Sequence, residues 1–161
     1  WLLFAPIKKT RTDFIVEKAT EMGVSRICPV NTDYTNSDRI KQSRLQSHSI
    51  EAAEQCGGTY VPPVDELSKL TSILKDWPKD RCLIFCDENK VGEAVKLFKS
   101  SVGDKWAILI GPEGGFSKNE IKYLKSLEFV TSISLGPRIQ RADTAVVAAL
   151  AIWQKEIGDW K

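Results

Sequence analysis

The sequence predicts an α/β fold in which a parallel β-sheet is covered by helices on both faces. Short apolar runs alternate along the chain with longer segments whose apolar residues recur at helical spacing, and this alternation is typical of parallel sheets. Two of the apolar runs, residues 106–110 and 133–135, lead directly into glycine loops. In open α/β sheets, ligands bind beyond the carboxyl ends of the strands. These two loops are therefore the first candidates for a functional site.

Strands are expected where short runs of branched or bulky apolar residues are bounded by glycine, proline or polar residues. These segments are residues 1–5, 25–30, 82–86, 106–110 and 133–135. Pro6 ends the first strand, and Pro29 is expected to break the second, because proline cannot donate a hydrogen bond to a strand ladder. The polar residues 31–38 are expected to form a loop.

Helices are expected where apolar residues recur every three or four positions. These segments are residues 14–23, 39–56, 67–74, 91–99, 117–127 and 144–153. Gly23 and Gly57 are natural C-caps for the first two helices. Ser117, followed three residues later by Glu120, is a capping-box signal, so the fifth helix is expected to begin there.

The last helix, residues 144–153, is almost wholly apolar. A helix that is hydrophobic on all sides must be buried all round. Two arrangements satisfy this requirement: burial against a second copy of the protein, or a deep position within one chain. The end helix of a small domain hardly achieves the second, so the sequence favours a homodimer.

Length and composition exclude several classes of protein. With 161 residues, the chain is long enough for one domain and too short for two of typical size. No apolar run approaches the roughly 18 residues that span a bilayer, and the start is too short for a secretory signal, so we expect no membrane association. The four cysteines form no C-x-x-C pair and His48 is the single histidine. We therefore expect reduced cysteines, a cytoplasmic protein and no metal site.

Basic residues cluster twice, although the formal net charge is only +2. The first cluster is Lys8, Lys9 and Arg11, and the second is Arg39, Lys41 and Arg44. Such clusters occur on nucleic-acid-binding surfaces and, more commonly, on solvated helix faces. Their spacing alone favours the solvated face.

The first glycine loop reads Gly111-Pro112-Glu113-Gly114-Gly115-Phe116-Ser117. Glycine permits a positive φ and leaves no Cβ in the way, so a ligand can approach the main chain closely. Neither G-x-G-x-x-G nor G-x-x-x-x-G-K-[ST] is present, and the Glu113 carboxylate would repel a pyrophosphate. The loop therefore suits a neutral or cationic ligand, with an ordinary turn before a capped helix as the alternative.

The second loop reads Gly136-Pro137-Arg138-Ile139-Gln140-Arg141-Ala142-Asp143-Thr144-Ala145. Together, the two loops resemble the signature loops of the RsmE family, the ribosomal RNA uracil-N3 methyltransferases of the SPOUT superfamily. Residues 17–24 (EKATEMGV) and 50–57 (IEAAEQCG) resemble that family too, in the expected order. The likeness covers nearly the whole chain.

This resemblance implies a SPOUT-type domain over residues 1–161, with a C-terminal trefoil knot, bound S-adenosylmethionine and a homodimer with its active site at the subunit interface. It implies methylation of uracil N3 in small-subunit (16S) ribosomal RNA, so ribosomal RNA and the small ribosomal subunit are the expected partners. The family's N-terminal PUA-like RNA-binding domain would precede Trp1 and is absent from this chain. The alternatives are a SPOUT methyltransferase acting on transfer RNA, and a non-catalytic RNA-binding or ribosome-assembly module with the same fold.

The resemblance also assigns roles to individual residues. It assigns cofactor binding to Ile110, Gly111, Glu113, Gly114, Gly115, Leu135, Gly136, Ile139, Gln140 and Arg141. Carbonyl groups and the Glu113 carboxylate suit a sulfonium cation. Arg138 and Arg141 are the candidate catalytic residues, because fixed cations beside the uracil carbonyl oxygens would stabilise the anion that forms when N3 loses its proton. Their alternative role is backbone or interface pairing. Water or Asp143 would accept the proton.

The chain departs from the family pattern at several positions. Gln140 stands where an apolar residue is usual, Ala142 where threonine is usual and Asp143 where glutamate is usual. Gly58 and Tyr34 stand where arginine is common. The chain therefore lacks two arginines that the resemblance would assign to contacts with RNA.

Overall fold

The computed structural model describes residues 1–37, 39–92 and 105–160. At its centre is a six-stranded sheet with the order β3-β2-β1-β5-β4-β6, in which every neighbouring pair of strands is parallel. The strands are β1 (Leu2–Phe4), β2 (Ile27–Asn31), β3 (Ser68–Lys69), β4 (Arg81–Cys86), β5 (Lys105–Ile110) and β6 (Val130–Ile133). The predicted α/β class with a parallel sheet is confirmed.

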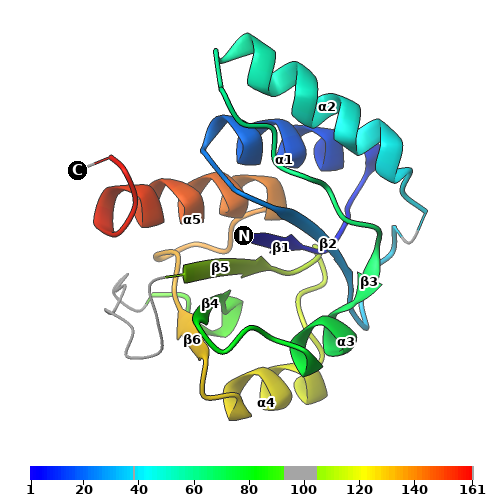
Figure 1. Ribbon diagram of the computed structural model, residues 1–161. Helices are drawn as coiled ribbons and strands as arrows, with labels where there is room; N and C mark the ends of the chain where they lie inside the picture. The colour runs from blue at the N-terminus through cyan, green and yellow to red at the C-terminus, as the bar shows by residue number, and fades with distance from the viewer. Residues whose placement is uncertain (38, 93–104, 161) are drawn as a thin grey trace.

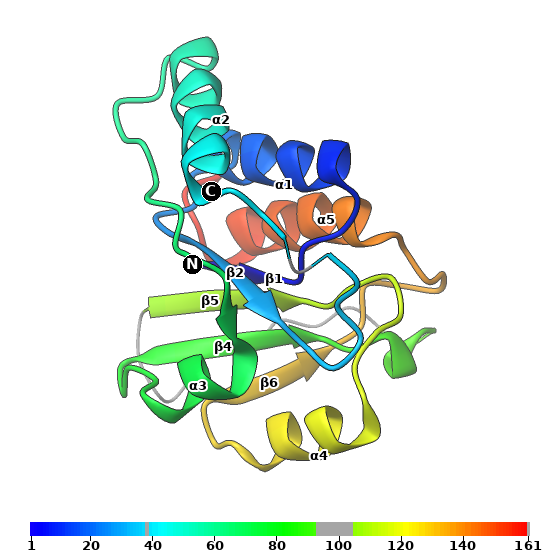
Figure 2. The same ribbon diagram turned by 90° about the vertical axis from the view of Figure 1, so that its right-hand side faces the viewer.

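Helices cover both faces of the sheet, as predicted. They are α1 (Lys9–Glu21), α2 (Gln42–Gln55), α3 (Leu70–Lys75), α4 (Lys118–Ser126) and α5 (Ala142–Glu156), with a short 3₁₀ helix η1 (Glu88–Lys90). Helices α1, α2 and α5 lie on one side of the sheet, and α3 and α4 lie on the other (Figures 1 and 2). Of the helix expected at residues 91–99, Val91 and Gly92 form a turn and the remainder lies outside the described residues.

All strands except β3 contribute side chains to two separate cores, one on each face of the sheet. In β1, Leu2 and Phe4 pack with Ile15 of α1 and Val146 of α5. Leu3, between them, packs on the other face with residues of α3 and α4 such as Leu124. Because successive side chains of a strand point to opposite faces, a strand buried on both sides becomes a continuous apolar run. This is why short apolar runs predicted β1, β2, β4 and β5.

The prediction that Pro29 breaks the second strand was wrong. Proline lies inside β2, paired with Phe4 of β1. Ile27 exchanges hydrogen bonds with Pro63 and Asp65 on the side away from β1, and Pro29, two residues on, faces that same side. There, pairing with β3 begins only at Val30. The missing N–H of proline therefore removes no ladder hydrogen bond.

Three predicted boundaries move. The strand expected at residues 133–135 is β6 (Val130–Ile133), which ends at Ile133 opposite Cys86, the last residue of β4. The first helix starts earlier than predicted, at Lys9, and Phe14 is 39% exposed rather than part of its buried face. The helix expected from residue 67 begins at Leu70, after the two residues of β3.

The capping box of α4 is confirmed, and it also fixes a neighbouring loop. Ser117 Oγ accepts from the Glu120 N–H at 3.2 Å, and Glu120 Oε2 accepts from the Ser117 N–H at 2.9 Å. Glu120 Oε1 also accepts from the Asp33 N–H at 2.9 Å, and Glu120 is buried. One carboxylate thus holds the loop after β2 against the loop after β5.

The remaining sequence expectations concern membranes, thiols and His48. Across the ranges given above, no helix combines the length and apolar character that a bilayer crossing requires. All four cysteines are free, and burial raises the pKa of Cys28 and of Cys86 to about 12, so both remain thiols at neutral pH. His48, the single histidine, lies on α2, and its ring nitrogens are 3.4 Å from a Glu17 oxygen and 3.6 Å from an Asp13 oxygen.

Candidate functional site

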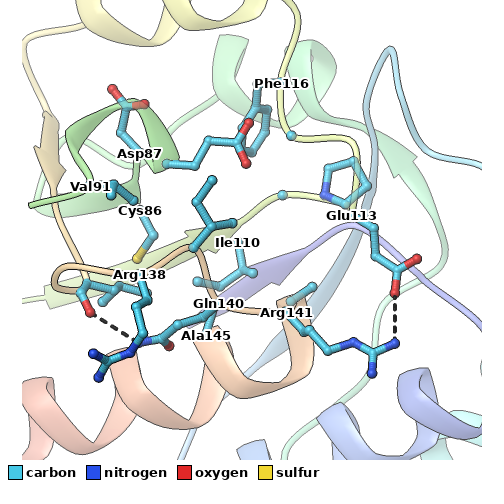
Figure 3. A pocket seen from close by; sticks show the side chains of 17 residues that line it. Cys86, Asp87, Val91, Ile110, Glu113, Phe116, Arg138, Gln140, Arg141 and Ala145 are labelled. Atoms are coloured by element: carbon cyan, nitrogen blue, oxygen red, sulfur yellow. Dashed lines mark hydrogen bonds and ion pairs between the residues drawn. The ribbon is translucent and has the colours of Figure 1, made fainter.

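Three loops meet where β5, β4 and β6 end. These strands are neighbours in the sheet and run parallel, so their carboxyl ends lie at the same edge. A cavity of about 420 Å³ lies there. Its walls are Cys86, Asp87, Glu88, Val91, Ile110, Gly111, Pro112, Glu113, Gly115, Phe116, Leu135, Arg138, Ile139, Gln140, Arg141, Ala142 and Ala145. Both loops that the sequence singled out therefore face one shared cavity (Figure 3).

Most of the predicted site residues line this cavity, but two glycines do not. Gly114 faces the loop after β2, where a Cβ on it would lie 3.4 Å from the Cβ of Tyr34. Gly136 supports the turn after β6 with a φ of +107°, a value that side chains rarely adopt. Both glycines therefore affect the conformation of the loops, while residues next to them line the cavity.

Two other glycines bring the main chain close to neighbouring side chains. A Cβ on Gly111 would lie 2.5 Å from the ring of Phe116, and a Cβ on Gly115, whose φ is +69°, would overlap Glu88 Oε1. The Phe116 ring also makes an edge-to-face contact with Phe85, with the ring centroids 5.1 Å apart. The loop can therefore pass this close to the wall only without side chains.

Asp87 forms a buried acidic anchor at the end of β4. Its Oδ2 is 2.8 Å from Lys125 Nζ, and its Oδ1 accepts from the N–H and the side-chain amide of Asn89. Burial raises the pKa of Asp87, but the hydrogen bonds from Lys125 and Asn89 lower it by more, so the net pKa lies below its ordinary value. Asp87 is therefore a fixed carboxylate at neutral pH, and it holds η1 beside the cavity.

The opposite rim of the cavity is basic. Arg138 and Arg141 lie on the same side of the cavity, across from Asp87 and Phe116 (Figure 3). The Glu113 carboxylate lies at this rim and not in the cavity: its Oε1 is 3.2 Å from Arg11 Nη1 and 3.9 Å from Arg141 Nη2. The negative charge of Glu113 is thus shared between two guanidinium groups.

Gln140 and Asp143 take positions that the sequence did not indicate. Gln140 Nε2 donates to the Leu135 carbonyl at 3.1 Å and so ties the second loop together, while its Oε1 is buried and finds no hydrogen-bond partner among the described residues. Asp143 Oδ2 lies 3.9 Å from Arg11 Nε, and Asp143 is not part of the cavity wall. Arg11 therefore connects both loops through Glu113 and Asp143.

Sequence reasoning missed one wall of the cavity. Cys86, Asp87, Glu88 and Val91 belong to a third loop, which follows β4. The sequence did predict a strand at residues 82–86, so this loop follows a predicted strand, as the other two loops do. Its glycine, Gly92, comes six residues after Cys86 and not next to the end of the strand, so the glycine-loop signal was missing. The position of β4 between β5 and β6 depends on sheet order, which a local pattern does not carry.

Comparison with known proteins places this geometry in context. A family model described as RNA methyltransferase domain matches residues 1–154. The ribosomal RNA small subunit methyltransferase E of Rickettsia conorii is 30% identical over 152 residues, which cover 93% of this chain and 62% of that protein. This chain therefore spans less than two thirds of the length of that relative.

Solved structures agree with this match. The crystal structure of a ribosomal RNA small subunit methyltransferase E from Neisseria gonorrhoeae, bound to S-adenosyl methionine, superposes with a TM-score of 0.83 at 29% identity, over 99% of this chain and 67% of that one. A methyltransferase from Legionella pneumophila in complex with the same cofactor gives a TM-score of 0.78 at 27% identity, over 95% and 65% of the two chains.

Proposed function

Because the chain belongs to the RNA methyltransferase domain family, we propose that it transfers a methyl group from S-adenosylmethionine to uracil N3 in small-subunit ribosomal RNA. The relatives also confirm the resemblance to the RsmE family. The observation that carries the proposal is the single cavity between the two signature loops. We take residues 1–161 as one methyltransferase domain, since both cores share a single sheet.

The cavity suits S-adenosylmethionine in size and in chemistry. Its volume of about 420 Å³ lies within the range of roughly 300 to 1,000 Å³ that is usual for small-molecule sites. Ile110, Phe116 and Leu135 offer an apolar wall to a flat base, and the glycine loop offers main-chain groups. Glu88 lines the cavity and forms no ion pair with another described residue. Its carboxylate therefore takes the role that the sequence gave to Glu113, that of facing a cationic ligand.

When bound, S-adenosylmethionine supplies an electrophilic methyl group whose sulfur leaves as a neutral thioether. The acceptor, uracil N3, carries a proton at neutral pH, and this proton must leave as the N3–carbon bond forms. The resulting negative charge spreads over the two flanking carbonyl oxygens. Holding the base in line with the methyl group is the main task of the protein, since alignment can supply about 7 to 11 kcal/mol.

Arg138 and Arg141 are the residues that would stabilise this negative charge. Both lie at the rim, where a base entering from solvent would place its carbonyl oxygens, and a fixed guanidinium favours an oxyanion. Asp143 is directed to Arg11 and not to the cavity, so it is poorly placed to accept the N3 proton. Water at the rim is the acceptor that this geometry favours.

We also propose that the C-terminal segment forms the trefoil knot of SPOUT domains. In support, the chain leaves β6 at the edge of the sheet, runs through residues 134–141 and enters α5 on the face opposite to α4 (Figures 1 and 2). The loop at residues 134–141 faces the loop at residues 111–117, and both line the cavity. A knot would fix these loops relative to one another and so preserve the cavity.

We propose a homodimer that forms through the outer face of α5. The inner face of α5 is buried against the core through residues such as Val146 and Leu150. The outer face is also apolar, with Val147, Ala151 and Ile152, but these residues remain partly exposed. A second copy would complete their burial, and the interface would lie beside the cavity, because Ala142 and Ala145 at the start of α5 line it.

Val147→Asp is expected to convert this dimer into a monomer, because a carboxylate at a closely packed apolar interface loses its hydration without gaining a partner. Multi-angle light scattering should report half the mass of the unchanged protein. Ile50→Asp on α2 is the matched control, since Ile50 is 43% exposed and lies on another helix; its mass should not change. A Val147→Asp protein that remains dimeric would refute this interface.

Two measurements test the proposed function. Calorimetric titration of the purified chain with S-adenosylmethionine should give saturable binding, and radiolabelled methyl groups should then appear at uracil N3 of small-subunit RNA. An absence of heat at millimolar cofactor would overturn the enzyme proposal.

Binding of S-adenosylmethionine followed by methylation of transfer RNA would favour the related SPOUT activity instead. Binding without transfer to any RNA would favour a non-catalytic module. We also propose that the protein is cytoplasmic, in keeping with its four free cysteines.

A further inference from the structure

We propose that a basic hollow beside the first turns of α1 and α2 binds the phosphate backbone of the RNA strand whose base enters the cavity. The hollow has a volume of about 510 Å³ and is lined by Lys9, Arg39, Lys41 and Arg44. This inference rests on the proposed function, because it takes RNA to be the substrate.

The hollow brings Lys9 of the first basic cluster together with all three residues of the second cluster. Lys9 comes from the start of α1, whereas Arg39, Lys41 and Arg44 come from the segment that leads into α2, some thirty residues later. Helices α1 and α2 pack side by side and bring these segments together (Figures 1 and 2). Four cations around one hollow are a concentrated positive charge in a chain whose formal net charge is only +2.

Most of this positive charge is not neutralised within the described residues. Arg44 pairs with Asp13. Lys9, Arg39 and Lys41 are exposed and form no ion pair with another described residue. Neither α1 nor α2 has an acidic residue in its first turn or a side-chain cap, so the partial positive charge of both helix N-termini adds to that of the side chains. Asp38 is the one carboxylate in the sequence between Asn36 and Arg44.

The hollow and the cavity lie on either side of the first turn of α1. Lys9 lines the hollow, and Arg11, two residues further on, makes the ion pair with Glu113 at the rim of the cavity. Tyr34 provides a second connection, since it lies against Gly114 of the first glycine loop and is 49% exposed. From Tyr34, the chain reaches Arg39 within five residues, at most about 18 Å.

This combination matches the chemistry of a single RNA strand. Proteins hold such strands through cations that follow the phosphates and through aromatic rings on which unstacked bases lie. Here the order is a cavity for one base, an exposed tyrosine for a neighbouring base, and a cationic hollow for the phosphates that follow. A small free anion would need only the hollow, and it would leave the exposed Tyr34 without a role.

The test is a triple variant in which Lys9, Arg39 and Lys41 are each changed to Gln. Binding of a single-stranded oligonucleotide from small-subunit RNA should weaken roughly ten- to hundred-fold at about 0.1 M salt. The slope of log affinity against log salt should fall by about 2, because each lost phosphate contact contributes about 0.7 for a single strand. Fluorescence anisotropy over a salt series measures both quantities. Affinity for S-adenosylmethionine should not change, because the three side chains lie outside the cavity.

The matched control changes Lys75, Lys79 and Lys122 to Gln, which removes the same charge from exposed residues in the α3 and α4 layer. Equal losses of RNA affinity in the two variants would overturn the proposal, since only net charge would matter. Unchanged RNA affinity, together with lost binding of inorganic phosphate, would make the hollow a site for a free anion and also overturn it. If the unchanged chain does not bind RNA at low salt, the proposed RNA-binding role of the hollow is also wrong. The chain could also fail to bind S-adenosylmethionine while only the Lys9, Arg39 and Lys41 variant shows a reduced RNA affinity. The methyltransferase proposal would then be wrong, and the proposed RNA-binding role of the hollow would be supported.

Discussion

Gly111→Ala is expected to lower the affinity for S-adenosylmethionine at least ten-fold, which corresponds to about 1.4 kcal/mol. The added Cβ would lie 2.5 Å from Phe116 Cε2 and 3.0 Å from two further atoms of that ring. The ring is also held by its edge-to-face contact with Phe85. Either the ring or the loop must therefore shift, and both line the cavity. Calorimetric titration measures the change in affinity.

Gly58→Ala is the matched control for this prediction. Gly58 lies after α2, and a Cβ on it would have its nearest contact at 3.4 Å, an ordinary distance. Its affinity for the cofactor should equal that of the unchanged chain. Thermal unfolding of each variant separates a local effect from a loss of fold. A folded Gly111→Ala protein with unchanged affinity would show that this loop is not a cofactor-binding surface.

The parts of the fold that the sequence predicted are those with local causes. The strand β5, the glycine loop and the capped start of α4 follow one another within some fifteen residues, and each has its own signal: an apolar run, glycines, and the Ser117–Glu120 capping box. Such signals need no knowledge of the rest of the chain. The resemblance to the RsmE family implied that both glycine loops bind one cofactor, and the parallel strands explain why the loops share a cavity, because such strands end at the same edge.

The parts that the sequence could not predict depend on distant neighbours. Pro29 is compatible with β2 only because β3 begins to pair one residue later, at Val30. The loop after β4 belongs to the cavity only because β4 lies between β5 and β6. The side chain of Glu113 is held at the rim by Arg11, which is 102 residues away in the chain. In each case a tertiary contact outweighs the local pattern.

The basic clusters show the same limit for a surface. Each cluster alone resembles a solvated helix face, which is the interpretation that spacing favours. Packing of α1 against α2 places Lys9 of the first cluster beside the second cluster, in one hollow next to the candidate active site. The function inferred for this surface therefore depends on where the charges meet and not on their number, since the chain has 23 basic and 21 acidic residues.

Arg141→Ala is expected to reduce methyl transfer by roughly a hundred-fold or more, because removing one fixed group that stabilises a developing oxyanion commonly has this effect. The Arg141 side chain is 64% exposed at the cavity rim, and its Nη2 lies 3.9 Å from Glu113 Oε1. This ion pair is long and exposed, so its loss should cost little stability. The affinity for S-adenosylmethionine should change by less than about three-fold, because the main chain of the loop remains in place.

Single-turnover transfer to RNA, measured beside cofactor titration, separates these two effects. Arg141→Lys keeps the positive charge but loses the planar guanidinium, so it should recover only part of the rate. Lys155→Ala, at the far end of α5, removes an exposed cation from the same helix and should leave the rate unchanged. If Arg141→Ala transfers methyl groups at the original rate, the charge on the uracil oxygens must be stabilised by another group, and Arg138 becomes the first residue to replace. If transfer and cofactor affinity fall together, Arg141 holds the cofactor and has no separate part in the chemistry.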